Sequence, residues 1–187
     1  MVTLVDWAPK VVEDLVRRGV RAFYQGLELP CPHLHVFNPK ADFFVYRDIV
    51  KRNTSEGMLD FTSTVSGLEG VTRGRNYRLI VVANGNHQKT IAQTSRVPHA
   101  AVLISLDRVL AAEGYDFVQT TEHELGHCLL NSGHHNKDKR DTAAWEEGKM
   151  DKGCIMATTY STSTKFCKTC KERGKEMQKW DVAYGFV

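Results

Sequence analysis

The segment TTEHELGHCLLNSGHH, residues 120–135, concentrates four histidines within a short part of the chain. His123 and His127 are four residues apart, so on a helix their imidazoles lie one above the other on the same face. Two converging imidazoles can bind zinc, and Glu124 beside the first of them can accept a proton from a metal-activated water. A chance His-Glu-x-x-His on an exposed helix is the alternative. The apolar opposite face of this segment and the His and Cys residues downstream favour a metal site.

A third protein ligand is expected, because a catalytic zinc typically has three ligands and one open position. In the extended metzincin motif a glycine ends the helix and a third histidine follows it. Here Leu130 stands in place of that glycine, and the spacer is one residue longer, which brings His134 to the third position. Asn131 is the expected helix terminator, since Asn tolerates the left-handed conformation. His134 is thus the predicted third ligand, and His135 is the alternative.

The chain has five cysteines, an odd number that argues against a disulfide framework, as does the lack of a leader segment. Cys167 and Cys170 form a C-x-x-C pair, which commonly supplies half of a tetrahedral zinc site. Cys128 falls on the apolar stripe of the zinc helix and is expected to be a buried free thiol, and Cys31 is expected to be structural. Met156 is the candidate for the tight methionine turn of the metzincins, with an ordinary core methionine as the alternative.

The spacing of hydrophobic residues predicts the helices and strands that position these residues. Residues 6–26 read as an amphipathic helix that stops at Gly26, and residues 55–68 read as a helix with Met58, Phe61, Thr62 and Val65 on one face. The zinc helix occupies the second half of 106–130, and a closing helix over 170–185 packs Met177 and Trp180 inward. The predicted strands are 33–37, 76–84, 89–95 and 100–105, with a candidate short first strand at 3–5. Helices that alternate with strands predict an α/β (α+β) domain.

Composition limits the class of protein. A chain of 187 residues with 42% hydrophobic content suits one compact domain. A net charge of +3 is too small to indicate a nucleic-acid or membrane partner. No run approaches the ~18 apolar residues of a membrane span, and no signal peptide is recognisable. A cytoplasmic location and a monomer are therefore the expectations.

Together these motifs resemble those of the archaemetzincins. In that family a cysteine follows the third zinc histidine, a second cysteine stands two residues before the methionine of the turn, and a C-x-x-C pair follows. The order of RLIVVAN, TIAQTS, AAVLISLDRV and the zinc helix is also similar. The resemblance implies a metzincin-like zincin domain with a mixed twisted sheet, an antiparallel cleft-edge strand, an active-site helix and a C-terminal helix. It also implies a structural zinc in addition to the catalytic one, held by His135, Cys154, Cys167 and Cys170.

The chain departs from the family pattern in three places. The spacer before His134 is longer by one residue, the loop over 136–153 is much longer, and the stretch from Met156 to Cys167 is shorter. The expected organisation is a single domain over 1–187. Its N-terminal subdomain, 1–133, ends in the zinc helix, and its C-terminal subdomain, 134–187, holds the methionine turn and the structural zinc.

The function expected from the site is hydrolysis of peptide bonds in peptide or protein substrates, with Glu124 as general base and two zinc ions per chain. An extended substrate is expected along an edge strand made of Thr90, Ile91, Ala92, Gln93 and Thr94. Tyr160 is either a hydrogen-bond donor to the developing oxyanion or a packing residue. The competing class is a zinc-stabilised binding or scaffold protein with little peptidase activity. A secreted, disulfide-bonded metzincin ranks lowest.

Overall fold

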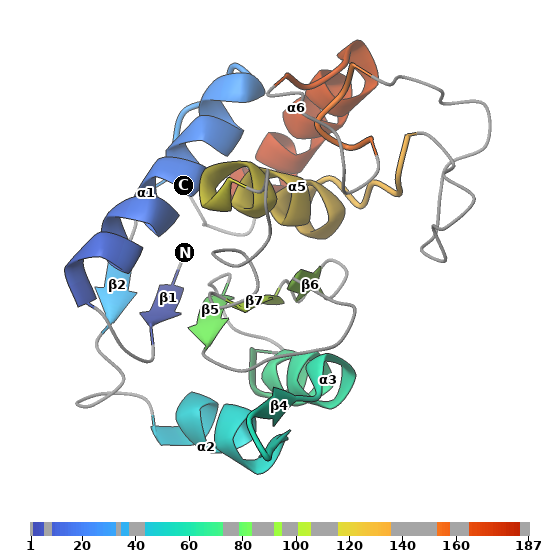
Figure 1. Cartoon of the computed structure of the whole chain (residues 1–187). Helices are drawn as coiled ribbons and strands as arrows, with labels where there is room; N and C mark the ends of the chain where they lie inside the picture. Colours follow the sequence, from blue (N-terminus) through green and yellow to red (C-terminus); the bar gives the residue numbers. More distant parts are fainter. Residues whose placement is uncertain are drawn as a thin grey trace.

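The computed structural model describes residues 2–5, 9–32, 35–37, 44–72, 79–83, 92–94, 101–105, 116–135, 153–157 and 165–183. Their helices lie on both faces of a central sheet, so the architecture is a three-layer α+β arrangement (Figure 1). α1 (Pro9–Gly26), α5 (Phe117–Leu129) and α6 (Lys168–Ala183) lie on one side, and α2 (Phe44–Arg52) and α3 (Phe61–Thr72) on the other. The fold class expected from the sequence is confirmed. Within these residues, no helix has the length and apolar character that crossing a membrane requires.

The sheet is mixed. Its described strands are β1 (Val2–Val5), β2 (His35–Phe37), β5 (Leu79–Ala83), β6 (Ala92–Thr94) and β7 (Ala101–Ser105), in the order β2-β1-β5-β7-β6. All neighbouring pairs are parallel except β6 and β7, which are antiparallel with Gln93 opposite Leu103. β5 and β7 are buried along their whole length, as expected for parallel strands covered on both faces. β6 is half-buried and forms the antiparallel edge that the sequence predicts.

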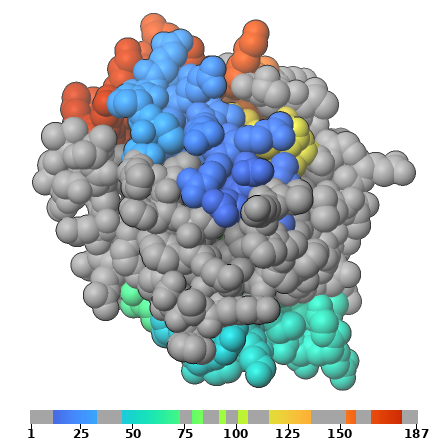
Figure 2. Space-filling model, turned by 90° about the vertical axis from the view of Figure 1, so that its left-hand side faces the viewer, coloured from blue at the N-terminus to red at the C-terminus, as the bar shows by residue number. Residues whose placement is uncertain are grey.

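Alternate residues of the central strands divide the core in two. Ile80, Val82, Val102 and Ile104 pack with the apolar sides of α1 and α5. Their neighbours Leu79, Val81 and Leu103 pack with α2 and α3. This alternation is the two-residue period of a strand, and it places α5 directly on the sheet. Figure 2 shows residues of α1, in blue, and of α2 and α3, in cyan to green, at opposite ends of one face of the molecule.

Two expectations for the region before β5 need correction. Met58 belongs to β4 (Met58–Leu59), which pairs with β3 (Thr54–Ser55) in a small hairpin, and its side chain is exposed. The helix expected over 55–68 therefore begins only at Phe61, where the Asp60 carboxylate accepts a hydrogen bond from the Ser63 backbone N–H (3.0 Å). Thr62 is exposed, and Thr64 lies on the buried face instead. α2 was not expected from the sequence.

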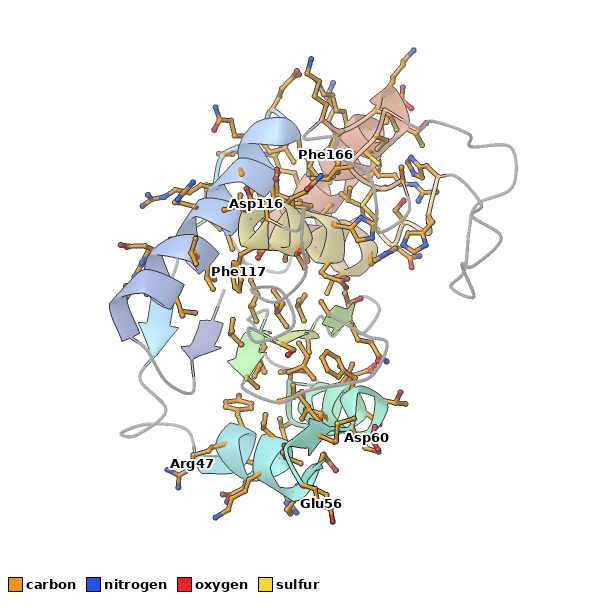
Figure 3. The ribbon with its side chains drawn as sticks, in the orientation of Figure 1. Arg47, Glu56, Asp60, Asp116, Phe117 and Phe166 are labelled. Carbon is orange, nitrogen blue, oxygen red and sulfur yellow. The ribbon has the colours of Figure 1, made fainter. Side chains whose placement is uncertain are left out.

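α5 has well-defined ends. At its N-terminus the Asp116 carboxylate accepts a hydrogen bond from the Val118 N–H (2.8 Å), which satisfies one of the first free amides of the helix (Figure 3). At its C-terminus Asn131 adopts a left-handed conformation with φ of 47°, as its residue type predicts. The predicted stripe is buried throughout and consists of Phe117, Thr121, Leu125, Cys128 and Leu129. This packing fixes which face of the helix is left for chemistry.

Candidate metal centres

Three histidine side chains converge beside α5. The Nε2 atoms of His123 and His127 are 3.0 Å apart, and each lies 3.1 Å from Nε2 of His134. The first two side chains come from successive turns of the helix, and the third follows the reversal of the chain at Asn131. Ligands around a tetrahedral zinc, at about 2.0–2.1 Å from the metal, would be about 3.4 Å apart. The three nitrogens, which we call the histidine centre, are therefore close to the spacing that a zinc ion imposes.

The other ring nitrogens show why these contacts are not ordinary hydrogen bonds. Nδ1 of His123 lies 2.7 Å from the carbonyl oxygen of Ile155, and Nδ1 of His127 lies 2.7 Å from that of Ser132. A carbonyl oxygen can only accept, so each Nδ1 carries the proton and each Nε2 of a neutral ring presents a lone pair. Two lone pairs that face each other at 3.0 Å repel unless a cation lies between them. The donor set therefore fits a metal ion.

Burial shifts the pKa values of His123 and Glu124 in opposite directions. Burial, together with the neighbouring imidazoles of His127 and His134, lowers the pKa of His123 well below its usual value. A neutral imidazole is the form that binds metal. Glu124 is also buried, and this burial raises the pKa of its carboxyl to about 8. A divalent cation nearby would oppose that effect and favour the carboxylate.

Met156 lies in a tight turn that packs against α5, the helix that carries His123 and His127. The turn is closed by a hydrogen bond from the Ala157 N–H to the Cys154 carbonyl (2.9 Å), and the Met156 side chain is fully buried. Its thioether packs against Gly126, the residue before His127, so closely that a Cβ there would overlap the sulfur. Met156 thus lies in a tight turn in contact with the helix that carries two of the histidines, an arrangement consistent with the predicted methionine turn.

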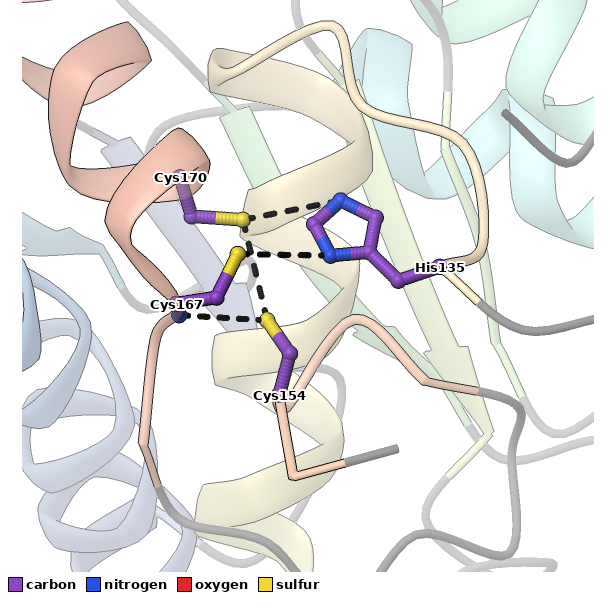
Figure 4. Close-up of side chains that lie close together, drawn as sticks. All are labelled: His135, Cys154, Cys167 and Cys170. Atoms are coloured by element: carbon purple, nitrogen blue, oxygen red, sulfur yellow. Dashed lines mark hydrogen bonds between the residues drawn. The ribbon is translucent and has the colours of Figure 1, made fainter. Parts of the chain in front are cut away.

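A second group of potential metal ligands consists of His135, Cys154, Cys167 and Cys170 (Figure 4). We call it the cysteine centre. The Sγ atoms of Cys154 and Cys170 are 3.7 Å apart, close to the ~3.8 Å expected for two thiolates at about 2.3 Å from a tetrahedral zinc. Nδ1 of His135 lies 3.5 Å from Sγ of Cys167. One histidine and three cysteines that lie within 4.8 Å of one another form a complete tetrahedral donor set.

The surroundings of Cys154 favour its thiolate. The backbone N–H groups of Met156 and Cys167 each donate to its Sγ (3.4 Å). The hydrogen bond with the Cys170 thiol lowers the pKa of Cys154, helped by His135, although burial acts in the opposite direction. The same contact raises the pKa of Cys170. Of the two sulfurs, Cys154 ionises first, as a metal-binding thiol must.

Packing holds the cysteine centre against the rest of the molecule. Phe166, directly before Cys167, is buried and stacks edge-to-face on Phe23 of α1, with ring centroids 5.4 Å apart (Figure 3). Cys170 lies in the first turn of α6. The C-x-x-C pair is therefore anchored by an aromatic contact on one side and by a helix start on the other.

Other residues singled out in the sequence lie elsewhere. Cys128 is a buried free thiol in the core, as expected, whereas Cys31 is exposed. The predicted substrate strand is described only at Ala92, Gln93 and Thr94, which form β6. Thr90, Ile91, Tyr160 and most of the long loop lie outside the described residues. Met177 is buried on α6, and nothing is described of the Trp180 side chain.

Two residues at the site had no signal in the sequence. Ser132 and Ile155 orient His127 and His123 through their backbone carbonyls. A carbonyl is present at every residue, so neither could be found from residue type. Both do lie next to predicted features, because Ser132 follows the helix terminator and Ile155 precedes Met156.

No family model matches the chain, and a search of curated proteins finds no match. Two solved structures are similar to it. An archaemetzincin from Methanopyrus kandleri has a TM-score of 0.62 and 18% identity, over 95% of this chain and 94% of that one. A zinc-dependent peptidase from Methanocorpusculum labreanum has a TM-score of 0.54 and 15% identity, over 92% of this chain and 99% of that one. At these identities the likeness shows the fold, which is that of the archaemetzincins, as the sequence motifs led us to expect.

Proposed function

We propose that this chain is a zinc-dependent peptidase whose catalytic metal is held by His123, His127 and His134. The observation that supports the proposal best is that the Nε2 atoms of His123 and His127 lie 3.0 Å apart with their lone pairs facing each other, an arrangement that a bound cation would stabilise. The carbonyls of Ile155 and Ser132 support it, because partners of this kind keep metal-binding histidines in the correct tautomer. The shared fold with a zinc-dependent peptidase is consistent with it.

The proposed chemistry divides between metal and protein. A zinc ion bound there supplies Lewis acidity, which polarises a carbonyl group and makes a water molecule more acidic. Glu124 is the proposed general base: its buried carboxylate removes a proton from the attacking water and then delivers it to the leaving amine. Burial raises the pKa of this carboxyl to about 8, which makes its carboxylate a stronger base, and a divalent cation nearby would favour the carboxylate form.

We also propose that the cysteine centre holds a second, structural zinc. All four of its ligands are protein side chains, and closed four-ligand sites of this type are structural. It ties His135 and the turn at Cys154 to the start of α6. Two zinc ions per chain are therefore expected.

The substrate is proposed to be an extended peptide that adds to the sheet at β6. Among the described strands, β6 lies at the edge of the sheet and pairs only with β7, and a sheet edge can bind an extended chain through backbone hydrogen bonds. The predicted contacts are Ala92, Gln93 and Thr94, together with Thr90 and Ile91 before them. For Tyr160 both predicted roles stay open, as a donor to the oxyanion or as a packing residue.

The test is peptide cleavage by the parent chain and by Glu124→Gln, which keeps the shape of the side chain and removes its basicity. We expect the variant to bind as much zinc as the parent and to lose about 10²–10⁴-fold in cleavage rate. A mixed peptide library analysed by mass spectrometry provides the readout, and a chelator that strips the metal is the control. If the zinc-loaded parent cleaves no peptide, the chain is instead a zinc-stabilised binding or scaffold protein.

A further inference from the structure

Ser132 lies at the junction of the two metal centres. Its backbone carbonyl is 2.7 Å from Nδ1 of His127 in the histidine centre, and its hydroxyl is 3.0 Å from Nε2 of His135 in the cysteine centre. The residue is buried, with 4% of its surface exposed. We propose that Ser132 is a positioning residue that couples the two centres, so that metal bound at the cysteine centre raises the metal affinity of the histidine centre. This inference rests on the proposed function, which supplies the two zinc ions.

The hydroxyl of Ser132 determines which nitrogen of His135 is the ligand. The Ser132 Oγ–H donates to the carbonyl of Gly133 (3.1 Å), so its oxygen is left to accept from Nε2–H of His135. That leaves Nδ1 of His135 unprotonated, at 3.5 Å from Sγ of Cys167. This distance matches the ~3.5 Å expected between nitrogen and sulfur ligands of one tetrahedral zinc. Nε2 of His135 also lies 3.8 Å from Sγ of Cys170, but it carries the proton that Ser132 accepts, so Nδ1 is the proposed ligand atom.

A second connection runs through the turn at Met156. The carbonyl of Ile155 accepts from Nδ1 of His123 (2.7 Å), and the residue before it is Cys154, a ligand of the cysteine centre. The His135 backbone N–H donates to the Met156 carbonyl (2.8 Å), which joins the two segments. Both carbonyls that orient the histidine centre thus lie within three residues of a ligand of the cysteine centre.

Coupling follows from this arrangement. A metal ion at the cysteine centre would hold His135 and Cys154 in place. These two residues would then fix the carbonyls of Ser132 and Ile155 before the histidine centre binds its own metal ion. Coupling between two sites is reciprocal, so occupancy of either centre strengthens the other. Loss of a partner that orients a metal ligand typically costs about 10–100-fold in affinity.

The experiment is zinc competition against a chromophoric chelator, with the full chain as parent and as Ser132→Ala. The substitution removes the hydroxyl and keeps the carbonyl that His127 contacts. We expect the zinc affinity of the histidine centre to fall about 10-fold. In the cobalt(II)-substituted protein, the thiolate-to-cobalt absorption band should also shift, because His135 loses the partner that selects Nδ1.

Thr64→Val is the matched control. It removes another buried hydroxyl, which donates to the Asp60 carbonyl, on the opposite face of the sheet. It should change neither the affinity nor the cobalt spectrum. Should Ser132→Ala fail to fold, Cys167→Ser weakens the cysteine centre with Ser132 intact and is expected to lower the affinity of the histidine centre as well.

The outcomes are distinguishable. If the parent binds two zinc ions and Ser132→Ala, or Cys167→Ser in its place, leaves the affinity of the histidine centre within about twofold of the parent, the coupling is overturned and the proposed function stands. If the parent binds fewer than two zinc ions, the proposed metal content fails and the coupling fails with it.

Discussion

Gly126 shows how closely the zinc helix is packed at the level of single residues. Met156 lies against it, with the thioether carbons 3.0 and 3.4 Å from the point where a Cβ would be and the sulfur closer still. The next residue is His127, so the position of the methionine controls how the helix presents that ligand. A glycine is required here because a Cβ would overlap the Met156 side chain, and not because of the backbone conformation.

We predict that Gly126→Ala destabilises the protein by about 1–3 kcal/mol, because the added methyl group overlaps a fully buried side chain. Chemical denaturation in the presence of excess zinc measures the free energy of unfolding. Gly70→Ala in α3 is the control: a Cβ there meets nothing within 4 Å, and removing a helical glycine should stabilise by up to about 1 kcal/mol. Equal effects of the two substitutions would contradict the packing described for Met156.

Side-chain chemistry is also the part of the site that the sequence predicts best. The histidines and cysteines carry their chemistry in their residue type, and the motif spacing together with the family resemblance predicted His134 for one group and His135 for the other. The carbonyls of Ser132 and Ile155 could not be predicted, since their role depends on where the chain passes. Ser132 could be recognised only after both centres had been placed.

α5 is the helix that positions His123 and His127 of the histidine centre. It begins after its N-cap Asp116 and ends before the left-handed Asn131, and its buried stripe leaves the histidines on a different face of the helix. The carbonyl of Asn131 also accepts from the Arg173 guanidinium of α6 (3.3 Å). The extra residue in the spacer before His134 is accommodated in this turn, which still brings the third histidine to the other two.

We predict that Asn131→Val destabilises the protein by about 1–2 kcal/mol and weakens zinc binding at the histidine centre, because a β-branched residue disfavours positive φ. Asn131→Gly, which adopts this conformation freely, should keep both properties. Thermal unfolding and zinc competition measure the two effects. A valine variant that binds zinc as tightly as the glycine variant would show that the turn does not position His134.

Element boundaries were predictable where a long periodic pattern supports them and not elsewhere. The amphipathic α1 was found from its helical period, and β5 and β7 were found from their continuous apolar runs. The hairpin of β3 and β4 was missed, because its strands are two residues each and Met58 happens to continue the helical spacing of α3. α2 is only nine residues long, which is too short for a clear period.

At the scale of the whole molecule, the sheet separates the two candidate metal centres from α2 and α3. Both candidate metal centres lie with α5 and α6, whereas α2 and α3 fill the opposite core (Figure 1). Strand order cannot be read from residue periods, since β1 pairs with both β2 and β5 across long connections. We propose a single domain over 1–187, with subdomains 1–133 and 134–187 that meet at His134.

The central claim is that three Nε2 atoms surround one zinc ion and a second zinc lies in the cysteine centre. An anomalous difference map from crystals of the protein, recorded at the zinc edge, tests it most directly. We predict two peaks, one about 2.0–2.1 Å from Nε2 of His123, His127 and His134, and one among His135, Cys154, Cys167 and Cys170. A zinc-saturated crystal with no peak between the three histidines would contradict the account.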